Sequence, residues 1–126
     1  MSMATKRIRV LHVDDNPDAR ALLSYILKAE ADLEDVGARS DAEGLEQAVR
    51  ETSPDVLLID LTMCGPDPIE AIRQVHAAFP ALRIVVLSGS RDTALLERAK
   101  KAGASQLALK AIGFTDTLAA IRGARR

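Results

Sequence analysis

Five short apolar runs alternate with five segments of helical period along this chain, and this alternation restricts the possible folds more than any other feature. The apolar runs are rich in branched aliphatic residues, which favour strands, and the segments between them repeat apolar residues with the period of a helix. Strict alternation predicts parallel strands joined by right-handed crossovers, in an α/β fold with helices on both faces of the sheet. The predicted strands are Ile8–Val13, Leu33–Ala38, Asp55–Ile59, Arg83–Ser88 and Gln106–Lys110, of which Leu33–Ala38 is expected to be weak and short.

The helical segments carry recognisable start and stop signals. Asn16 and Pro17 are typical of an N-cap and a first helical residue, and Ser40 and Glu43 have the spacing of a capping box. The other expected boundary residues are Arg50, Pro80 and Gly103, which end the second, third and fourth helices, Thr115, which caps the start of the fifth helix, and Arg122, which lies at its end. In the first helix the apolar residues that share one face are Ala19, Leu22, Leu23, Ile26 and Leu27.

The length and composition fit one soluble domain that covers residues 1–126. Its core is expected to be largely aliphatic, because the chain has only two Phe, one Tyr and no Trp. The net charge of −1 offers no basic surface for nucleic acid, so we expect this domain itself to bind none. The single cysteine suits a reducing compartment, and no apolar run is long enough for a membrane span. A cytoplasmic location without membrane contact is therefore expected.

Reactive side chains stand at the carboxyl ends of four predicted strands, where the functional crevice of such sheets lies. These side chains are Asp14 and Asp15 after the first strand, Asp60 after the third, Ser88 at the end of the fourth, where Gly89 follows it, and Lys110 at the fifth. Three clustered carboxylates repel one another unless a cation joins them, and hard oxygen ligands suit Mg²⁺. A carboxylate can also accept a phosphoryl group, whose oxygens a lysine and a hydroxyl would help to neutralise.

Each of these residues also has a purely structural interpretation. An aspartate after a strand is often only a helix cap, and Asp14-Asp15 could serve only as a turn. Ser88 could be a cap, and a lone lysine such as Lys110 is usually solvated. Their joint occurrence at one edge of the sheet favours a functional site.

Several motifs together resemble the receiver domain of two-component response regulators over essentially the whole length. The motifs are VDD (Val13–Asp15), LLIDLTM (Leu57–Met63), VVLSG (Val85–Gly89), KAGA (Lys101–Ala104) and the single residue Lys110. The resemblance implies a doubly wound (βα)5 fold of the flavodoxin-like type, a three-layer sandwich with strand order 2-1-3-4-5.

The resemblance also implies a phosphoacceptor site. Asp60 would accept a phosphoryl group from a phosphohistidine of a sensor histidine kinase or phosphotransfer protein. Asp15 and Asp60 would ligate Mg²⁺ together with the backbone carbonyl of Thr62, and Asp14 would hold a metal-bound water.

The remaining roles concern the bound phosphoryl group. Ser88 and Lys110 would contact its oxygens, and Gly89 suits the family's preference for a small residue beside them. Thr62 and Ser90 occupy positions that tune phosphate loss. Phosphorylation would shift the face formed by the fourth helix, fifth strand and fifth helix, through which receivers often form homodimers.

Four residues depart from the family pattern. Cys64 and Pro68 stand where the loop after Asp60 usually has Pro and Gly, so we expect rigidity to move along this loop while the acceptor site is kept. Leu107 replaces the usual Tyr or Phe, and so provides no aromatic ring to swing inward, and Ala111 replaces a frequent Pro.

The non-proline after Lys110, followed by the helix Asp116–Ala124, resembles receivers of the LuxR/NarL type, whose output is a helix-turn-helix domain. We expect the chain to be the N-terminal part of such a regulator, with a stand-alone receiver as the alternative. A receiver-like interaction module that works without phosphorylation is the competing function. A Mg²⁺-dependent phosphatase is disfavoured, because Thr62 stands where that class has a second aspartate.

Overall fold

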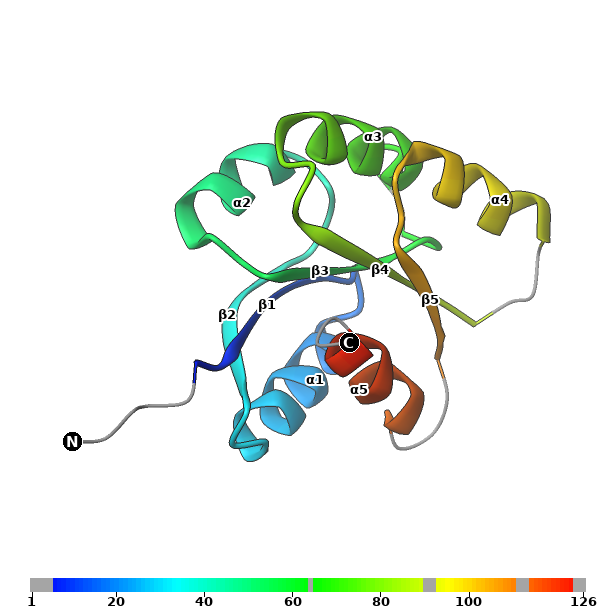
Figure 1. Cartoon of the computed structure of the whole chain (residues 1–126). Coiled ribbons are helices and arrows are strands. Elements are labelled where there is room, and N and C mark those ends of the chain that lie inside the picture. Colours follow the sequence, from blue (N-terminus) through cyan, green and yellow to red (C-terminus); the bar gives the residue numbers. More distant parts are fainter. Residues whose placement is uncertain (1–5, 64, 90–92, 111–113, 124–126) are drawn as a thin grey trace.

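Five parallel strands form one sheet with the order β2-β1-β3-β4-β5, as the resemblance implied (Figure 1). The computed structural model describes residues 6–63, 65–89, 93–110 and 114–123, so Cys64, Ser90 and Ala111 lie outside the described residues. The strands are β1 (Ile8–Val13), β2 (Leu33–Arg39), β3 (Val56–Asp60), β4 (Arg83–Ser88) and β5 (Gln106–Leu109). The helices are α1 (Pro17–Ala29), α2 (Leu45–Thr52), α3 (Pro68–Ala78), α4 (Thr93–Ala102) and α5 (Thr115–Arg122).

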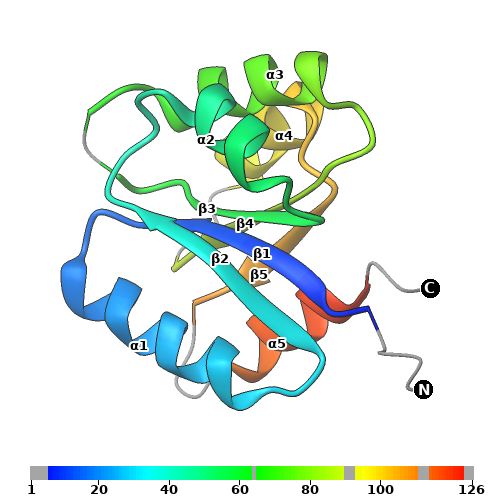
Figure 2. The ribbon, with the colours of Figure 1, turned by 90° about the vertical axis from the view of Figure 1, so that its left-hand side faces the viewer.

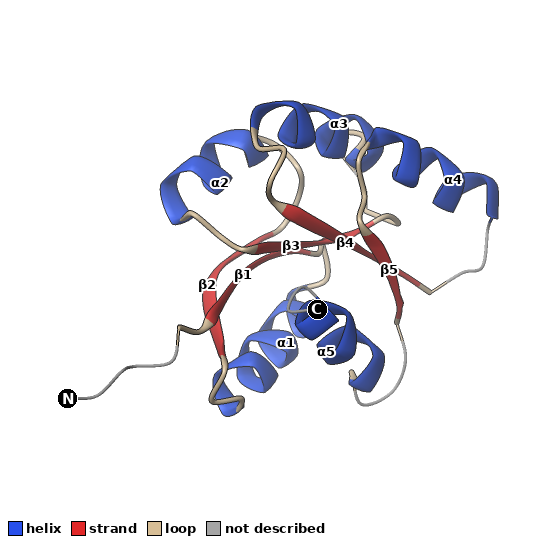
Figure 3. Ribbon diagram, viewed as in Figure 1, coloured by secondary structure: helices blue, strands red, loops and turns tan. Residues whose placement is uncertain are grey.

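The helices divide between the two faces of the sheet, which confirms the three-layer arrangement. α2, α3 and α4 cover one face, and α1 and α5 lie side by side on the other (Figures 2 and 3). Each face has its own apolar cluster, and the central strand β3 is buried along its whole length. Within the described parts of the chain, no helix combines the length and apolar character needed to cross a lipid bilayer.

The strand predicted to be weak and short is the longest of the five, with seven residues in β2. It pairs with β1 in parallel, and the register shifts between Val10 and Leu11. β2 lies at the edge of the sheet, and most of its side chains are only partly buried. An edge strand lacks the continuous aliphatic run that marks a central parallel strand, so its length could not be predicted from its apolar pattern.

Two predicted helix starts are wrong. α2 begins only after Gly44, which adopts a left-handed conformation with φ of 65°. The Asp41 carboxylate instead accepts the backbone N–H of Glu43 at 2.9 Å, a local turn that competes with helix formation. The N-cap of α5 is Phe114, also left-handed, and Thr115 is already the first helical residue.

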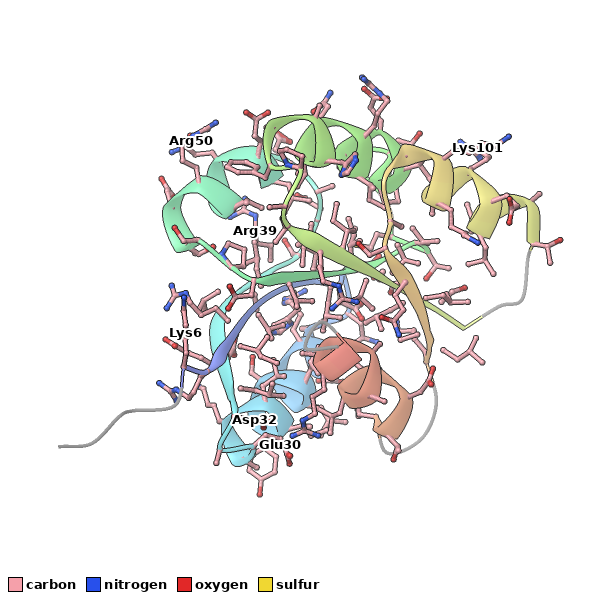
Figure 4. The ribbon with its side chains drawn as sticks, in the orientation of Figure 1. Lys6, Glu30, Asp32, Arg39, Arg50 and Lys101 are labelled. Carbon is pink, nitrogen blue, oxygen red and sulfur yellow. The ribbon has the colours of Figure 1, made fainter. Side chains whose placement is uncertain are left out.

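The end of α5 is tied to the turn between α1 and β2 by a cluster of charges. The Arg122 guanidinium donates to the carboxylates of Asp32, at 2.8 and 2.9 Å, and of Glu30, at 2.5 Å. Figure 4 shows Glu30 and Asp32 together at this turn. Its hydrogen bonds to the carboxylates of Asp32 and Glu30 raise the pKa of Arg122 above its usual value. This cluster joins α1, β2 and α5 at one corner of the molecule.

Candidate functional site

The sheet brings the predicted acids to one place at the carboxyl ends of β1 and β3. Asp14 and Asp15 directly follow β1, and Asp60 is the last residue of its neighbour β3. Each of the three residues offers a carboxylate oxygen, and these oxygens lie within 4.8 Å of one another. Asp14 and Asp60 are buried, with 5% and 1% exposed, whereas Asp15 is exposed. The cluster therefore has a buried floor and a side open to solvent.

Both carboxylate oxygens of Asp60 accept hydrogen bonds. Oδ1 accepts from the Thr62 backbone N–H at 2.9 Å and from the Thr62 hydroxyl at 2.7 Å. Oδ2 accepts from Lys110 Nζ, also at 2.7 Å. Burial raises the pKa of Asp60, but the hydrogen bonds from Lys110 and Thr62 together outweigh burial and hold the pKa below its usual value. Asp60 is therefore an ionised carboxylate at neutral pH.

Lys110 joins the two buried acids. Its Nζ lies 3.1 Å from Asp14 Oδ2 in addition to its contact with Asp60. The strand β5 delivers the lysine to this position, because the Lys110 backbone N–H continues the sheet pairing by donating to the Ser88 carbonyl at 2.9 Å. Burial lowers the pKa of Lys110, but hydrogen bonds to Asp60 and Asp14 outweigh it and raise the pKa above its usual value.

Arg20, which sequence reasoning missed, holds the backbone beside the acids. Its Nη1 donates to the Asp14 carbonyl at 2.7 Å, while the Asp14 N–H donates to the Arg39 carbonyl at 3.0 Å. The backbone N–H of Asn16 donates to Asp14 Oδ1, so Asp14 is held on several sides. An arginine one turn into the helix after the paired acids was the only sequence signal. It could not reveal a contact to backbone.

The other predicted site residues lie around this cluster. Ser88 ends β4 and is fully buried. Gly89 is exposed, and a Cβ atom built there would have no neighbour within 4 Å, so local packing does not require glycine in this conformation. Leu107, in β5, is 37% exposed, on the side of the strand next to α4.

The loop after Asp60 ends in a well-formed helix start. Asp67 is the N-cap of α3, and its Oδ1 accepts the backbone N–H of Ile69 at 2.9 Å. Pro68 is the first helical residue, a position for which its ring restraint is well suited. Pro68 therefore restrains the start of α3 rather than the middle of the loop. Gly65 has a φ of 94°, which favours glycine.

The donor set of this acidic cluster fits a hard divalent cation. Three carboxylates against one ammonium leave two net negative charges, and the ligand atoms are all oxygens. Such a set, open to water on the Asp15 side, is typical of Mg²⁺ sites that retain several waters. Chemically, the arrangement combines a buried nucleophilic carboxylate, a neighbouring cation and room for a metal.

Comparison with known proteins agrees with this geometry. The chain is 39% identical over 120 residues to the transcriptional regulatory protein LiaR of Bacillus subtilis, a match that covers 94% of this chain and 56% of LiaR. It is also 39% identical over 104 residues to protein-glutamate methylesterase/protein-glutamine glutaminase 5 of Myxococcus xanthus, covering 82% of this chain and 30% of that enzyme. The chain thus spans little more than half of the first relative and a third or less of the second.

Comparison with solved structures and with family profiles shows to which family the chain belongs. A two-component response regulator of the LuxR family from Aurantimonas sp. superimposes with a TM-score of 0.86 at 30% identity, covering 94% of this chain and 84% of that one. The sequence profile described as "Response regulator receiver domain" matches residues 10–122. The chain therefore belongs to the response regulator receiver domain family.

Proposed function

We propose that the chain is a phosphorylation-dependent switch in which Asp60 is the phosphoacceptor. The observation that carries this proposal is the buried Asp60 carboxylate, 2.7 Å from the Lys110 ammonium and clustered with two further acids. The phosphodonor is the phosphohistidine of a sensor histidine kinase or phosphotransfer protein. In the transfer, one Asp60 oxygen forms a bond to phosphorus as the bond from phosphorus to the histidine nitrogen breaks, and the imidazole leaves.

The chain's own groups prepare this step. The Lys110 ammonium donates a hydrogen bond to Asp60 Oδ2. During transfer it can donate to a phosphoryl oxygen instead and neutralise the negative charge of that oxygen. The Thr62 backbone N–H on Oδ1 keeps the carboxylate oriented during the attack. The Thr62 hydroxyl contacts the same oxygen, which makes Thr62 a candidate for tuning the rate of phosphate gain and loss. Ser90 is proposed for a similar tuning role on sequence grounds alone.

Asp15, Asp60 and the backbone carbonyl of Thr62 would hold Mg²⁺, and Asp14 would hold a water bound to it. When bound, Mg²⁺ supplies positive charge that offsets the repulsion between the carboxylates and the incoming phosphoryl oxygens. The tight grouping of the three carboxylate oxygens supports this assignment.

The output of the switch is proposed at the surface of α4, β5 and α5. Ser88 would move toward the phosphoryl oxygens, beside Gly89, and bias this surface between two states. A cavity of about 320 Å³ lies between α4 and β5, lined by Leu96, Lys100 and Leu107 among others. We propose that this surface can also form a homodimer, as receivers often do through this face.

The resemblance to LiaR supports transcription as the controlled process, with DNA bound by a separate output domain rather than by this domain. We propose that residues 1–126 form one receiver domain, that it works in the cytoplasm, and that it turns over no external substrate. The match to the Myxococcus xanthus methylesterase covers only 30% of that enzyme, so its catalytic activity is not transferred to this chain.

The test is phosphorylation by acetyl phosphate with and without Mg²⁺, followed by intact-mass spectrometry. We expect one phosphoryl group per chain in wild type with Mg²⁺, and none in Asp60→Asn. Asp67→Asn is the matched control, because asparagine is an equally good N-cap for α3 and the variant should be phosphorylated normally. A different result would support an interaction module that works without phosphorylation. In that result the wild type stays unmodified, and wild type and Asp60→Ala bind the same partner protein equally well.

A further inference from the structure

Phe114 stands at a position that suits neither its backbone nor its side chain. It is the N-cap of α5 and has a φ of 60°, in the left-handed region that a bulky residue rarely adopts. An N-cap is normally a residue whose side chain accepts a backbone N–H, and Phe114 makes no such bond. Neither local preference favours phenylalanine, so the surrounding structure must hold it in this conformation.

Phe114 lines a small cavity that adjoins the acidic cluster. The cavity has a volume of about 60 Å³, and its wall is mostly apolar. Asp14 and Lys110 line it on the side of the site, and Ala19 and Leu23 line it on the side of α1. An apolar cavity of about 150 Å³ holds a benzene molecule, so this one admits only part of an aromatic ring while Lys110 keeps its present position.

Lys110 is the part of this wall that phosphorylation would move. Its Nζ lies 2.7 Å from Asp60 Oδ2 and 3.1 Å from Asp14 Oδ2. A phosphoryl group on Asp60 offers the ammonium new oxygens, and an ammonium that donates to one of them leaves its place beside Asp14. Because Asp14 also lines the cavity, this departure enlarges the cavity on the side of the site.

Hydrogen bonds join the end of β5 to the first turn of α5. The Leu109 backbone N–H donates to Asp116 Oδ2 at 2.7 Å. The Phe114 carbonyl accepts the backbone N–H of Leu118 at 2.9 Å, a bond that begins the helix. A change at Lys110 therefore reaches the start of α5 through the backbone as well as through the cavity.

Phe114 is also the aromatic residue placed closest to the site. The chain has two Phe, one Tyr and no Trp, and all three rings belong to described residues. Tyr25 is 73% exposed on α1, and Phe79 follows α3 at the opposite edge of the sheet, with Arg50 5.4 Å above its ring. Leu107, where related receivers have Tyr or Phe, carries no ring.

We propose that Phe114 is the aromatic group through which phosphorylation of Asp60 changes the start of α5. When Lys110 leaves Asp14, the Phe114 ring moves into the enlarged cavity and its backbone leaves the left-handed region. Both changes favour the phosphorylated state, because the first buries apolar surface and the second relieves backbone strain. This inference rests on the proposed function. The response arises on the face of the sheet that carries α1 and α5 (Figure 2).

Ring labelling of phenylalanine with ¹³C gives a direct test, because the two phenylalanines lie at opposite edges of the sheet. Wild type is observed by NMR with Mg²⁺ alone, and then with Mg²⁺ and acetyl phosphate, which transfers its phosphoryl group to Asp60 and leaves as acetate. The Phe114 signal should shift as the phosphorylated fraction rises, whereas the Phe79 signal should stay in place. Intact-mass spectrometry of the same samples gives the phosphorylated fraction.

Two variants separate movement of the ring from its mere proximity to the new charge. Ala19→Leu fills the cavity from α1, so this variant should be phosphorylated while its Phe114 signal loses most of the shift. Phe114→Leu removes the ring, so it should be phosphorylated while the backbone amide signals of Asp116 and Thr117 no longer shift. Phe79→Leu is the matched control and should keep the shifts of both amides. Thermal melting verifies that each variant is folded.

The outcomes distinguish this inference from the proposed function. A phosphorylated wild type whose Phe114 signal stays in place would overturn the inference and leave the proposed function standing. The same conclusion would follow from an Ala19→Leu variant that keeps the full shift, or from a Phe114→Leu variant whose α5 amide signals still shift. A wild type that takes up no phosphoryl group would overturn both.

Discussion

Replacing Lys110 by methionine should make the acidic cluster bind Mg²⁺ more tightly while making the metal-free protein less stable. The ammonium lies 2.7 Å from Asp60 and 3.1 Å from Asp14, so it occupies oxygens that a metal would also use. Two cations that share the Asp60 carboxylate are roughly 5 Å apart, and even at the dielectric constant of water their repulsion is about 1.7 kcal/mol. Screening at physiological ionic strength removes about half of this energy.

The expected gain in Mg²⁺ affinity for Lys110→Met is therefore about fourfold. In the absence of metal, two buried carboxylates lose their ammonium partner. Because the Lys110 side chain is itself 35% exposed, we expect a loss of only about 1–3 kcal/mol in the free energy of unfolding. Lys110→Arg is the control, since it keeps the positive charge and should show no gain in Mg²⁺ affinity.

Isothermal titration calorimetry at constant ionic strength is the suitable assay, because the chain contains no tryptophan whose fluorescence could report the metal. Urea unfolding with and without Mg²⁺ gives the stability. The reasoning is refuted if Lys110→Met binds Mg²⁺ no more tightly than wild type, because the ammonium and the metal would then not compete for the same carboxylates.

Three further predictions concern one contact outside the site and two groups within it. Gly103→Ala should lower the free energy of unfolding by about 2–3 kcal/mol, because Gly103 has a φ of 127° and a Cβ there would lie 2.4 Å from His76 Cγ. Arg20→Met should weaken Mg²⁺ binding at least about threefold in calorimetry, since the Asp14 carbonyl loses its donor and the acid is held less firmly. The pKa of Asp60 is lower in the folded protein than in the unfolded chain, so its ionised form stabilises the metal-free fold above the ordinary aspartate pKa of about 3.9. This contribution is lost as the pH falls from there through the lower pKa of the folded state, and acid titration of Asp60→Asn should lack it.

Each of these predictions has an internal control. Gly89→Ala should change stability by no more than about 0.5 kcal/mol, because a Cβ at Gly89 meets no atom within 4 Å. A loss as large as that of Gly103→Ala would contradict the steric argument. Arg20→Lys keeps the charge but not the planar guanidinium, so full Mg²⁺ affinity in this variant would show that the guanidinium contact to the Asp14 carbonyl is not needed. Equal acid sensitivity of wild type and Asp60→Asn would exclude Asp60 as a source of the pH dependence.

Much of the candidate site could be predicted from sequence because its residues stand at strand ends. In a parallel sheet the carboxyl ends of neighbouring strands meet at one edge, so the order of apolar runs already placed Asp14, Asp15, Asp60 and Lys110 near one another. The contact between Lys110 and two acids, by contrast, spans 50 residues to Asp60 and depends on side-chain reach across the sheet. No local pattern encodes such a distance.

The helix and strand boundaries also fall into two groups: those that local sequence predicts and those that depend on the surrounding structure. Asn16 and Pro17 were predicted correctly as the start of α1, because a cap acts within one turn of its own helix: the Asn16 side chain accepts the N–H groups of Asp18 and Ala19. The start of α2 was not, because the Asp41 turn used the local hydrogen bonds that a capping box would need. The length of β2 depends on pairing with β1, which lies far away in the sequence.

By itself, the sequence determined the alternation of strands and helices, the layered α/β fold and the set of reactive residues at the strand ends, because these follow from local periodicity and from the geometry of parallel sheets. Only the tertiary structure decided which of these groups touch, that Arg20 holds the Asp14 backbone, and that Leu22 and Tyr25 stay exposed on α1. The physical reason is that helical period fixes the direction of a side chain on its helix. How much of that helix the sheet and α5 cover depends on how the layers pack.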